Sequence, residues 1–597
     1  MNDQAGPFSD AQKEYLEGYA AGLRLRELLP FVGERGDGRI TSTPGDGAAN
    51  LAAPLDGEET AFGIPIDELT REERFKLEEN PLDIWDKILR HAAAGTPPEG
   101  GDVFRFKFHG LFYVAPTQDS LMLRVRVPAN EIAARQMRAL AGIAKRWGNG
   151  QAHVTTRGNI QIREIAPGDI VNVLMALSDA GLTSRGAGAD NVRNITATPT
   201  SGLDPAELYD VRPLAKGLQF YLSNNRDLFG LPRKFNVAFD TGGSVSVVSD
   251  TNDIGFQAVR IDEAKGAARG FAAGVCFRVL LGGITGHGFF AEDAGIVVPP
   301  EECVAVAAAM IRVFAALGDR TDRKKARLRH LIDRVGLDAY LAAVEDKLAF
   351  PLRRLPPDMG SRPRAVIRHG HVGAYTQKQP GLSYVGVAVP VGRLTVAQMS
   401  KLAELAEERG SGALRLTVWQ NVILPDIEDG DLGAVRRRVK AMGLDTSASA
   451  ASAGLVACTG NTGCKFALSD TKRHALEIRR ALDRAVTLDG PVNIHLTGCP
   501  NSCAQHYVGD IGLLGAQVAA GSETVEGYTV LLGGGFGREQ ALAREIASGV
   551  PADALPGALC RLLKTYLARR ETGESFAAFA QRHEVGDLRA MLLDGVS

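Results

Sequence analysis

The sequence predicts an α+β protein that is internally duplicated in the order A, B, A′, B′. Residues 109–162 align without a gap onto residues 371–424, and each copy reads as a strand, an amphipathic helix and a strand. The segments that follow these copies also share short motifs, since Asp253-Ile-Gly255 recurs as Asp510-Ile-Gly512. A gapless match of this length is typical of a duplicated unit.

Length and composition limit the class of protein. The chain has 597 residues, which is too long for one hydrophobic core and predicts at least three domains. Its net charge of −2 disfavours general binding to nucleic acid. Neither a signal-peptide pattern at Met1–Tyr15 nor an apolar run long enough for a bilayer is visible. We therefore expect a cytoplasmic protein without membrane or nucleic-acid partners. We also expect a monomer, although charge and hydropathy do not determine the oligomeric state.

The first hundred residues carry no recognisable chemistry. Ser9-Asp-Ala-Gln12 resembles a capping box and predicts a helix that reaches about Leu29, and residues 33–58 have the composition of a flexible connector. A second capping box, Thr70-Arg-Glu-Glu73, predicts another helix that Asn80-Pro81 interrupts. We expect this region to wrap the body of the protein.

Four of the seven cysteines form two tight pairs, Cys458 with Cys464 and Cys499 with Cys503. Thiolates are soft ligands that suit an iron–sulfur cluster or a structural zinc ion. Zinc usually uses pairs with shorter spacing, and a disulfide is disfavoured in a reducing cytosol. The pattern therefore favours a cluster, with zinc and plain packing as alternatives. Residues 465–480 read as a helix, which would place Cys464 near a helix N-terminus, where a thiolate is favoured.

The two cysteine pairs, with Thr-Gly-Cys-Pro-Asn-Ser-Cys over Thr497–Cys503, resemble the signature of the sirohaem-containing nitrite and sulfite reductases. The resemblance implies that the four thiolates hold a 4Fe-4S cluster and that Cys503 also bridges to the sirohaem iron. It further implies an α+β fold in which two paired ferredoxin-like half-domains flank two larger α+β domains that share the cofactors.

The repeat and the resemblance together predict six segments, joined near residues 352–364 by a Pro- and Arg-rich stretch. They are an N-terminal helix and connector (1–64), a helical extension (65–104), the first ferredoxin-like half-domain (105–170), a sirohaem/substrate domain (171–352), the second ferredoxin-like half-domain (366–430) and a 4Fe-4S/sirohaem domain (445–597).

The two copies differ in charge, which suggests that an anionic ligand lies against the first. Arginines of the first copy align with uncharged residues of the second: Arg124, Arg157 and Arg163 align with Gly386, Trp419 and Pro425. Sirohaem carries several carboxylates, and a buried carboxylate must be paired or hydrogen-bonded. The resemblance assigns cofactor carboxylates to one strand, through Thr155, Thr156, Arg157, Gln161 and Arg163. Gly158 departs from the family, many members of which have Gln there.

Four further residues resemble the substrate side of the family: Arg124, Arg193, Lys234 and Asn236. The resemblance implies that they bind a small oxyanion, stabilise its charge and relay protons. In Lys234-Phe-Asn236 the strand period puts both polar side chains on one face. Arg126 is the rival of Arg124. Without the motifs, a surface ion pair is the simpler interpretation of each residue.

Asn236 favours nitrite over sulfite, because sulfite reductases of this family tend to have a second lysine there. Gly318–Lys325 resembles another family segment near the cofactor, although a solvated basic helix start explains it equally well. Gly533–Gly537 lacks the context of a dinucleotide loop, so we expect electrons from a separate donor of the ferredoxin type. The hypothesis is a ferredoxin-dependent assimilatory nitrite reductase. The alternatives are a sulfite reductase, a related corrin-pathway oxygenase, and a non-catalytic iron–sulfur or zinc protein.

Overall fold

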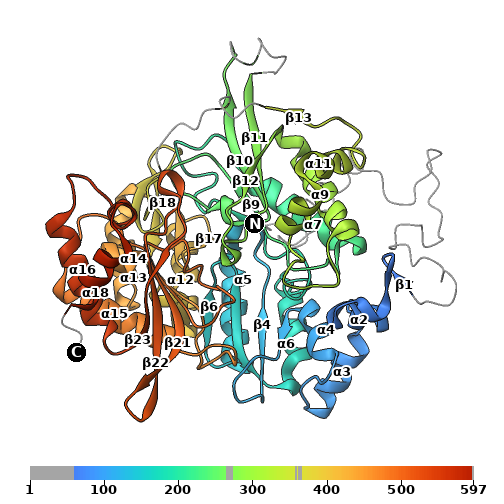
Figure 1. The fold of residues 1–597 in the computed structure, drawn as a ribbon, viewed down its shortest axis with the longest axis horizontal. Coiled ribbons are helices and arrows are strands. Elements are labelled where there is room, and N and C mark those ends of the chain that lie inside the picture. The colour runs from blue at the N-terminus through green and yellow to red at the C-terminus, as the bar shows by residue number, and fades with distance from the viewer. Residues whose placement is uncertain (1–59, 264–265, 267–272, 356–359, 361–365, 595–597) are drawn as a thin grey trace, which may run out of the picture.

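The computed structural model describes residues 60–263, 266, 273–355, 360 and 366–594. The helix predicted from Ser9 and the connector predicted over residues 33–58 lie outside these residues. The described part is a mixed α+β protein with four sheets of five or six strands and one two-stranded ribbon, which confirms the predicted fold class (Figure 1). Within it, no helix combines the length and the apolar character needed to cross a membrane.

The repeated units supply two of the four large sheets. The first unit comprises β3 (Leu111–Phe112), β4 (Leu121–Arg124), β5 (Glu131–Ala133), α5 (Ala134–Trp147), β6 (Gln151–Val154), β7 (Ile160–Ile165) and α6 (Ile170–Asp179). The second comprises β14 (Gly373–Thr376), β15 (Leu382–Val387), β16 (Arg393–Thr395), α12 (Val396–Arg409), β17 (Ala413–Leu416), β18 (Val422–Glu428) and α13 (Leu432–Ala441). Their sheets have the strand orders β16-β6-β7-β4-β3 and β14-β15-β18-β17-β5.

The two units exchange one strand each. β5 of the first unit pairs with β17 of the second, and β16 of the second unit pairs with β6 of the first. Helices α5 and α12 pack together, and one hydrophobic core contains buried side chains of both units. The pair therefore forms one body. The sequence did not reveal the exchange, because a strand of three residues is too short to show alternation.

The two larger units repeat one sheet topology. The first comprises β8 (Thr196–Ala197), β9 (Val237–Asp240), β10 (Ile254–Ile261), β11 (Gly274–Leu281), β12 (Glu292–Val298) and the edge strand β13 (Arg353–Arg354). The second comprises β19 (Leu455–Ala457), β20 (Ile494–Thr497), β21 (Ile511–Ala520), β22 (Glu523–Leu532) and β23 (Arg544–Pro551). In each, three parallel strands are followed by two antiparallel ones.

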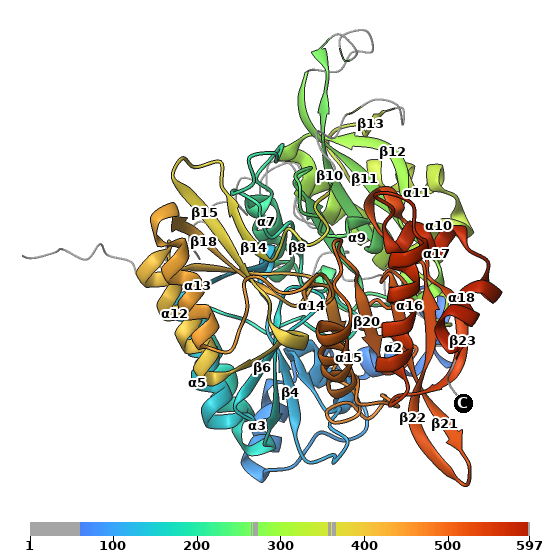
Figure 2. The same ribbon diagram turned by 90° about the vertical axis from the view of Figure 1, so that its left-hand side faces the viewer.

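Each larger sheet packs its own helices and has its own core (Figure 2). The first has α7 (Arg212–Asn224), α9 (Cys303–Leu317), α10 (Leu328–Val335) and α11 (Leu337–Glu345). The second has α14 (Ala450–Ala453), α15 (Thr471–Ala485), α16 (Leu555–Arg569), α17 (Phe576–Arg582) and α18 (Val585–Leu593).

The repeated Asp-Ile-Gly motif is a buried carboxylate that ties neighbouring elements together. Asp253 precedes β10, accepts a hydrogen bond from Arg327 Nη2 at 2.7 Å and accepts another from the backbone N–H of Asn236 at 2.8 Å. Asp510 precedes β21 and accepts from Arg368 Nη2 at 2.6 Å and from the backbone N–H before β20 at 2.7 Å. Each of these aspartates therefore fixes the start of the middle one of three parallel strands, β9 in the first sheet and β20 in the second.

The N-terminal segment, with β1 (Thr60–Ala61), β2 (Ile64–Pro65), α2 (Arg71–Glu78), α3 (Trp85–Ala94) and α4 (Asp102–Arg105), packs beside the first larger unit. Helix α2 begins directly after Thr70, as predicted, but the Thr70 side chain makes no capping hydrogen bond. The carboxylate of Glu73 instead binds Arg320 Nη1 at 2.6 Å and Lys76 Nζ at 2.5 Å. A tertiary ion pair has replaced the local cap.

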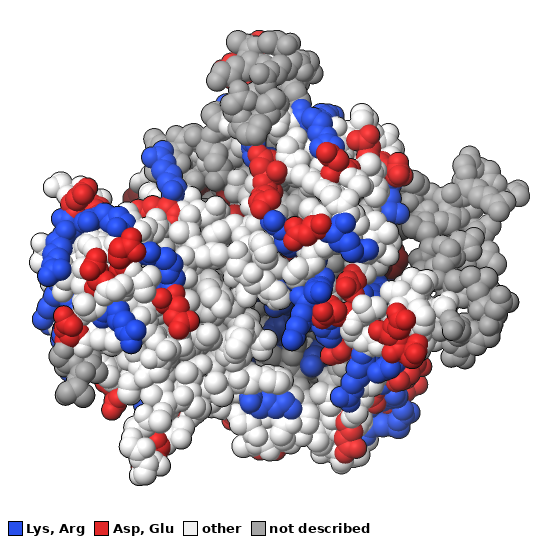
Figure 3. Space-filling model, viewed as in Figure 1, with Lys and Arg blue, Asp and Glu red and all other residues white. Residues whose placement is uncertain are grey.

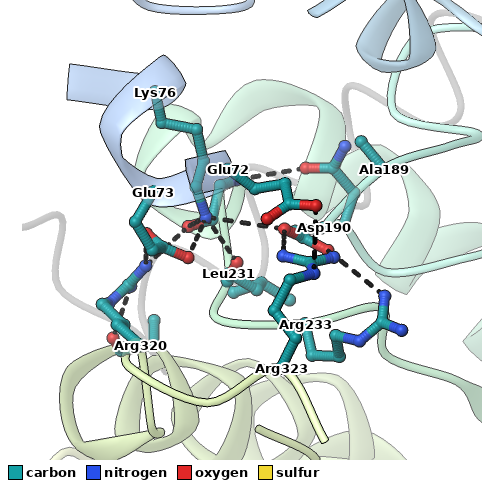
Figure 4. Close-up of polar contacts among 12 residues, drawn as sticks. Glu72, Glu73, Lys76, Ala189, Asp190, Leu231, Arg233, Arg320 and Arg323 are labelled. Atoms are coloured by element: carbon teal, nitrogen blue, oxygen red, sulfur yellow. Dashed lines mark hydrogen bonds and ion pairs between the residues drawn. The ribbon is translucent and has the colours of Figure 1, made fainter. Parts of the chain in front are cut away.

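Asp190 is the centre of this ion-pair network (Figure 4). Its fully buried carboxylate accepts two hydrogen bonds from Arg323, at 2.8 and 2.9 Å, and lies 3.7 Å from Lys76 Nζ and 3.9 Å from Arg233 Nη1. Burial raises the pKa of Asp190, but Lys76, Arg323 and Arg233 outweigh burial and the net shift is downward. The network joins α2 to the segments that carry Arg193 and Lys234.

We expect Asp190→Asn to lower the free energy of unfolding by about 3 kcal/mol, because the nearly buried Lys76 and the half-buried Arg323 and Arg233 lose their shared, fully buried counter-charge. The contribution of Asp190 is present above its unfolded pKa of about 3.9 and is lost as pH falls through its lower folded pKa. Chemical denaturation at neutral pH measures the loss. The control is Glu72→Gln, which removes a half-exposed partner of Arg323 and should cost less than about 1 kcal/mol. Equal losses in both variants would contradict this role of Asp190.

Candidate functional site

The four predicted ligand cysteines gather at one edge of the sheet of the C-terminal unit. Cys458 directly follows β19, and Cys499 lies two residues beyond β20. These strands are parallel neighbours, so their carboxyl ends meet, and such an edge is the usual ligand position in open sheets. Cys458 and Cys464 act electrostatically on Cys499, and Cys458 acts on Cys503 as well. The structure therefore brings both pairs together.

Hydrogen-bond donors face two of these sulfurs. The backbone N–H of Gly498 donates to Cys458 Sγ at 3.2 Å, and Asn501 Nδ2 donates to Cys499 Sγ at 3.5 Å. Such bonds stabilise thiolates and influence the potential of a bound cluster. Among the described residues, no three His, Cys, Asp or Glu side chains stand at the spacing of a single metal ion. The ligands of a four-iron cluster lie farther apart than those of one ion, because each thiolate binds a different iron.

The segment after Cys464 is not the helix predicted over residues 465–480. Helix α15 begins only at Thr471, where the carboxylate of Asp470 accepts a hydrogen bond from the backbone N–H of Arg473 at 3.2 Å. The preceding segment is irregular, and the N–H of Leu468 donates to the carbonyl of Gly498 at 2.8 Å. This tertiary hydrogen bond holds residues 465–470 in a non-helical conformation despite their local helix propensity. Cys464 therefore lies away from the helix N-terminus.

Thr155, Thr156 and Arg157 form a hairpin turn between β6 and β7 rather than part of a strand. Thr155 Oγ1 accepts a hydrogen bond from the N–H of Arg157 at 3.1 Å, which fixes the turn. Thr156 Oγ1 donates to the carbonyl oxygen of Cys503 at 2.9 Å. The turn therefore connects the first repeated unit directly to the cysteine loop.

Asn130 occupies the space that a side chain at position 158 would need. Gly158 is the position at which many members of the resembled family have Gln. Gly158 has a φ of 56°, and a Cβ there would lie 1.4 Å from Asn130 Nδ2, which donates to the carbonyl of Gly158 at 3.0 Å. The second unit has the reverse arrangement at the aligned positions. Gln420 occupies the turn there, and its Cβ lies 2.9 Å from the position of a Cβ on Gly392. A large side chain on one member of the pair requires glycine on the other.

Arg157 extends from the turn into the first larger unit. Its Nη2 donates to the carbonyls of Asn194 at 2.7 Å and Val237 at 3.2 Å, and its Nη1 donates to Asn252. Burial lowers the pKa of Arg157 to about 10. Its buried Nε has no hydrogen-bond partner. The residue thus keeps donor capacity for a further ligand.

Arg163, assigned with Gln161 to the cofactor, contacts the cysteine loop. Its Nη1 donates to the carbonyl of Gly463 at 2.6 Å, and its Nη2 donates to Thr459 Oγ1 at 2.6 Å. Gln161 Oε1 accepts from the same guanidinium at 3.0 Å. Arg163 therefore holds the loop between Cys458 and Cys464, a contact that sequence reasoning missed.

Arg124 and Arg193 converge on one backbone oxygen. Arg124 ends β4, stacks over the ring of Phe112 at 4.3 Å and donates to the carbonyl of Ala187 at 3.3 Å. Arg193 donates to the same carbonyl at 3.1 Å. Burial lowers the pKa of both arginines, and the charge of Arg124 lowers that of Arg193 further. Arg193 also donates to the carbonyl of Ala189 at 2.8 Å, and these neutral carbonyls leave both positive charges uncompensated.

Arg126, the rival of Arg124, has a different environment. It lies beyond the end of β4 and is buried, with its guanidinium turned into neighbouring backbone. Its acceptors are the carbonyls of Arg185, Gly186, Val192 and Arg193 and the Oε1 of Gln219. Arg126 is fully engaged in holding this segment, which favours Arg124 as the group available to a ligand.

Lys234 and Asn236 flank the buried Phe235, and both are half-buried, in agreement with the predicted alternation. Within the described residues, Lys234 Nζ forms no hydrogen bond or ion pair. Burial, followed by the charge of Arg327, lowers the pKa of Lys234 to about 7. Cys503 acts on Lys234 in the opposite direction, so the lysine and the cysteine loop share one environment.

We call Arg124, Arg157, Arg163, Arg193 and Lys234 the cationic wall. None of these five residues forms an ion pair in the part of the chain that the structure describes, and three of them have a buried Nε without a partner. Buried cations without counter-charges are costly. The set therefore fits a carboxylate-rich group such as the sirohaem that the resemblance implies. Figure 3 shows a hollow near the centre of one face, with Lys and Arg side chains at its edge.

Sequence reasoning also missed how neighbouring cations are neutralised. Arg327, which depresses the pKa of Lys234, is itself paired with Asp253. The segment Gly318–Lys325, which resembles a family segment near the cofactor, directs Arg320 and Arg323 to Glu73 and Asp190. The repeated Asp-Ile-Gly motif was the signal that could have indicated the Asp253 pair.

Comparison with protein-family models gives two descriptions, each matched twice. The description "Nitrite/Sulfite reductase ferredoxin-like half domain" matches residues 113–180 and 375–442. The description "Nitrite and sulphite reductase 4Fe-4S domain" matches residues 188–352 and 450–592. The four matches alternate along the chain in the predicted order A, B, A′, B′.

Curated proteins and solved structures agree with these matches. The chain is 36% identical to a ferredoxin–nitrite reductase of Synechococcus elongatus, over 83% of this chain and 96% of that one. It is 34% identical to the chloroplastic ferredoxin–nitrite reductase of Zea mays, over 83% of this chain and 89% of that one. The solved structure of the NirA protein of Mycobacterium tuberculosis superposes with a TM-score of 0.79 at 28% identity, covering 87% of this chain and 98% of that one.

We expect the affinity of the cationic wall for a small anion such as nitrite to fall as pH rises from about 6 to about 8. Lys234, with a pKa of about 7, loses its charge in this interval. A bound anion raises the pKa of Lys234, so binding is accompanied by uptake of a proton by the lysine. Titration calorimetry in buffers of different ionisation enthalpy measures both effects. Lys234→Met should bind more weakly and without the pH dependence. A wild-type affinity that is constant from about pH 6 to 8 would contradict this role.

Proposed function

The chain belongs to the nitrite and sulphite reductase family, and we propose that it reduces nitrite to ammonium, with six electrons from a ferredoxin-type donor. The observation that carries the proposal is the position of the cationic wall beside Cys503, since Lys234 and Arg124 both act electrostatically on this thiol. The proposed oxyanion site would therefore lie beside the proposed electron-transfer ligand. The names of the relatives support nitrite as the substrate.

The residues present fit a sirohaem and a 4Fe-4S cluster as cofactors. Cys458, Cys464, Cys499 and Cys503 would hold the cluster, with Cys503 shared with the sirohaem iron. When bound, these groups would supply single-electron transfer to the substrate. Among the residues assigned to sirohaem carboxylates, Arg157 and Arg163 have the strongest support, because the buried Nε of each has no hydrogen-bond partner. Thr155 is engaged in the turn, and the Nη atoms of Arg163 hold the cysteine loop.

The substrate-side residues divide the work by charge. Arg124 and Arg193 are fixed through the carbonyl of Ala187 and would bind the oxyanion and offset its charge. Lys234 would hold and release a proton at Nζ, because a pKa of about 7 allows exchange near neutral pH. Asn236, whose backbone N–H is held by Asp253, would offer a neutral hydrogen-bonding side chain.

Charge also supports nitrite over sulfite. A lysine in place of Asn236 would stand two residues from Lys234, whose pKa is already lowered by burial and then by the charges of Arg327, Arg193 and Arg233. The wall of this chain thus presents one cation fewer than a Lys-x-Lys sequence would. A monoanion requires less counter-charge than the more highly charged sulfite. Sulfite reduction on the same scaffold is the second candidate.

We expect a large preference for nitrite when kcat/KM for nitrite and for sulfite are compared anaerobically with a chemical reductant. Asn236→Lys should move the ratio toward sulfite by about tenfold, the effect of about 1.4 kcal/mol in transition-state binding. Asn224→Lys adds the same charge at a polar position on α7 and is the control. A wild-type preference for sulfite would leave the family assignment intact but would overturn the proposed substrate.

We expect Cys503→Ser to abolish spectroscopic coupling between the haem and the cluster and to lower nitrite turnover strongly. The reason is that a shared thiolate is the proposed link between the two centres. Electron paramagnetic resonance of the reduced enzyme measures the coupling. Cys560→Ser, on helix α16, removes a thiol away from the site and should leave both properties unchanged. Full activity in Cys503→Ser would rule out the proposed ligand.

A further inference from the structure

A cavity of about 440 Å³ lies beside the cysteine loop, next to the cationic wall. Its lining includes His153 of β6, Arg163 of β7 and Arg393 of β16, together with Thr459 and Gly463 of the loop. Three strands of one sheet therefore supply three basic side chains of the cavity, and one of them is the strand exchanged from the second repeated unit. Helix α15 supplies two more, Arg473 and Arg480. None of the roles proposed above uses His153 or Arg393.

Three basic side chains of this cavity have a buried nitrogen atom without a hydrogen-bond partner. His153 is 7% exposed and Arg163 is 9% exposed, and the Nδ1 of His153 and the Nε atoms of Arg163 and Arg393 are buried without a hydrogen-bond partner. Arg393 forms no ion pair among the described residues. Burial, with the charges of Lys472, Arg163 and Arg393, holds the pKa of His153 well below its usual value. The environment of His153 is thus strongly positive.

The second repeated unit shows how the same position is neutralised. There, Glu131 of β5 pairs across the sheet with Arg415 of β17, at the positions that align with Arg393 and His153. The Glu131 carboxylate lies 2.5 Å from Arg415 Nη1 and 3.2 Å from Lys216 Nζ. The exchange of strands has thus put the carboxylate of Glu131 opposite Arg415 in the second sheet. In the first sheet it has put the guanidinium of Arg393 opposite His153. The first sheet lacks the counter-charge that the second contains.

The carboxylates at the cavity do not supply this charge. Glu164 accepts a hydrogen bond from Asn149 Nδ2 at 2.9 Å, and Asp470 caps helix α15 and pairs with Arg473 at 3.4 Å. Lys472, 2% exposed, adds another cation, and its Nζ donates only to the carbonyl of Val391. A buried positive group requires an anion or a hydrogen-bond acceptor.

We propose that this cavity is a binding site for a carboxylate or similar small oxyanion, held by His153, Arg163 and Arg393. The ligand takes the place that Glu131 has in the second sheet. Two sources have this chemistry: a peripheral carboxylate of the tetrapyrrole cofactor, and a free anion. Arg124, Gln161, His153 and Arg393 are paired in turn on four adjacent strands, so Arg124 and Arg393 lie three strand spacings, or about 14 Å, apart. A cofactor bound at the cationic wall would have to extend over this distance to reach the cavity. The proposal does not depend on which oxyanion the enzyme reduces.

Arg393→Glu tests the site in the purified holoenzyme, because it recreates the ion pair of the second sheet. Two quantities are measured: the change in Tm with inorganic phosphate at constant ionic strength, and the ratio of sirohaem absorbance to acid-labile sulfide. Arg393→Lys keeps the charge and should behave like wild type. Lys401→Glu, an exposed change of the same charge on α12, is the control.

If the ligand is a free anion, phosphate raises the Tm of the wild type and of Lys401→Glu, and the rise is lost in Arg393→Glu. If the ligand is a cofactor carboxylate, phosphate has no such effect, and Arg393→Glu has a lower sirohaem ratio than Lys401→Glu. His153→Gln should show the same loss to a smaller extent. It replaces Arg393→Glu as the test variant if Arg393→Glu does not fold. Equal behaviour of all variants in both measurements would overturn the proposal. Nitrite turnover is not a readout, so failure of the proposed reaction would be recognised separately.

Discussion

Uncompensated positive charge at the junction of the repeated units and the larger units is the constraint on which the site depends. Among the described residues beside this junction, two buried carboxylates neutralise cations: Asp190 neutralises the cations behind Arg193 and Lys234, and Asp253 neutralises Arg327. At the junction the guanidinium groups meet only backbone carbonyls and neutral side chains. Hydrogen bonds to neutral groups do not remove the charge, and this is why we propose that the folded protein binds anions there.

The two copies of each unit share one fold, and the residues proposed to bind the cofactors and the substrate occur where the copies differ. Both larger units place loops at the carboxyl ends of parallel strands, but only the second carries cysteines there. Both half-domains have the same hairpin turn, yet only the first has an arginine in it, at Arg157. The exchange of β5 and β16 makes the two half-domains one body, so a change in one copy alters the environment of the other.

This coupling is visible at two places. In the turns, Asn130 opposite Gly158 and Gly392 opposite Gln420 are complementary solutions to one steric problem. In the exchanged strands, Glu131 neutralises Arg415, whereas Arg393 adds to the charge around His153. The first case keeps the fold while residue size changes. The second case changes the net charge of a buried site, which is a change in binding properties.

The sequence alone determined the duplication, the fold class, the cysteine pairs and the excess of arginine in the first copy, because these are properties of spacing and residue type. It also indicated that Lys234 and Asn236 share a face, since alternation is local. It did not determine the strand exchange, the start of α15 at Thr471 or the turn at Thr155–Arg157. The first depends on strands too short to show a period, and the second on a hydrogen bond from Leu468 to Gly498. Which cations lack a counter-charge was decided only by tertiary structure, because Asp190, Asp253 and Glu131 find their partners across sheets and helices far apart in the chain.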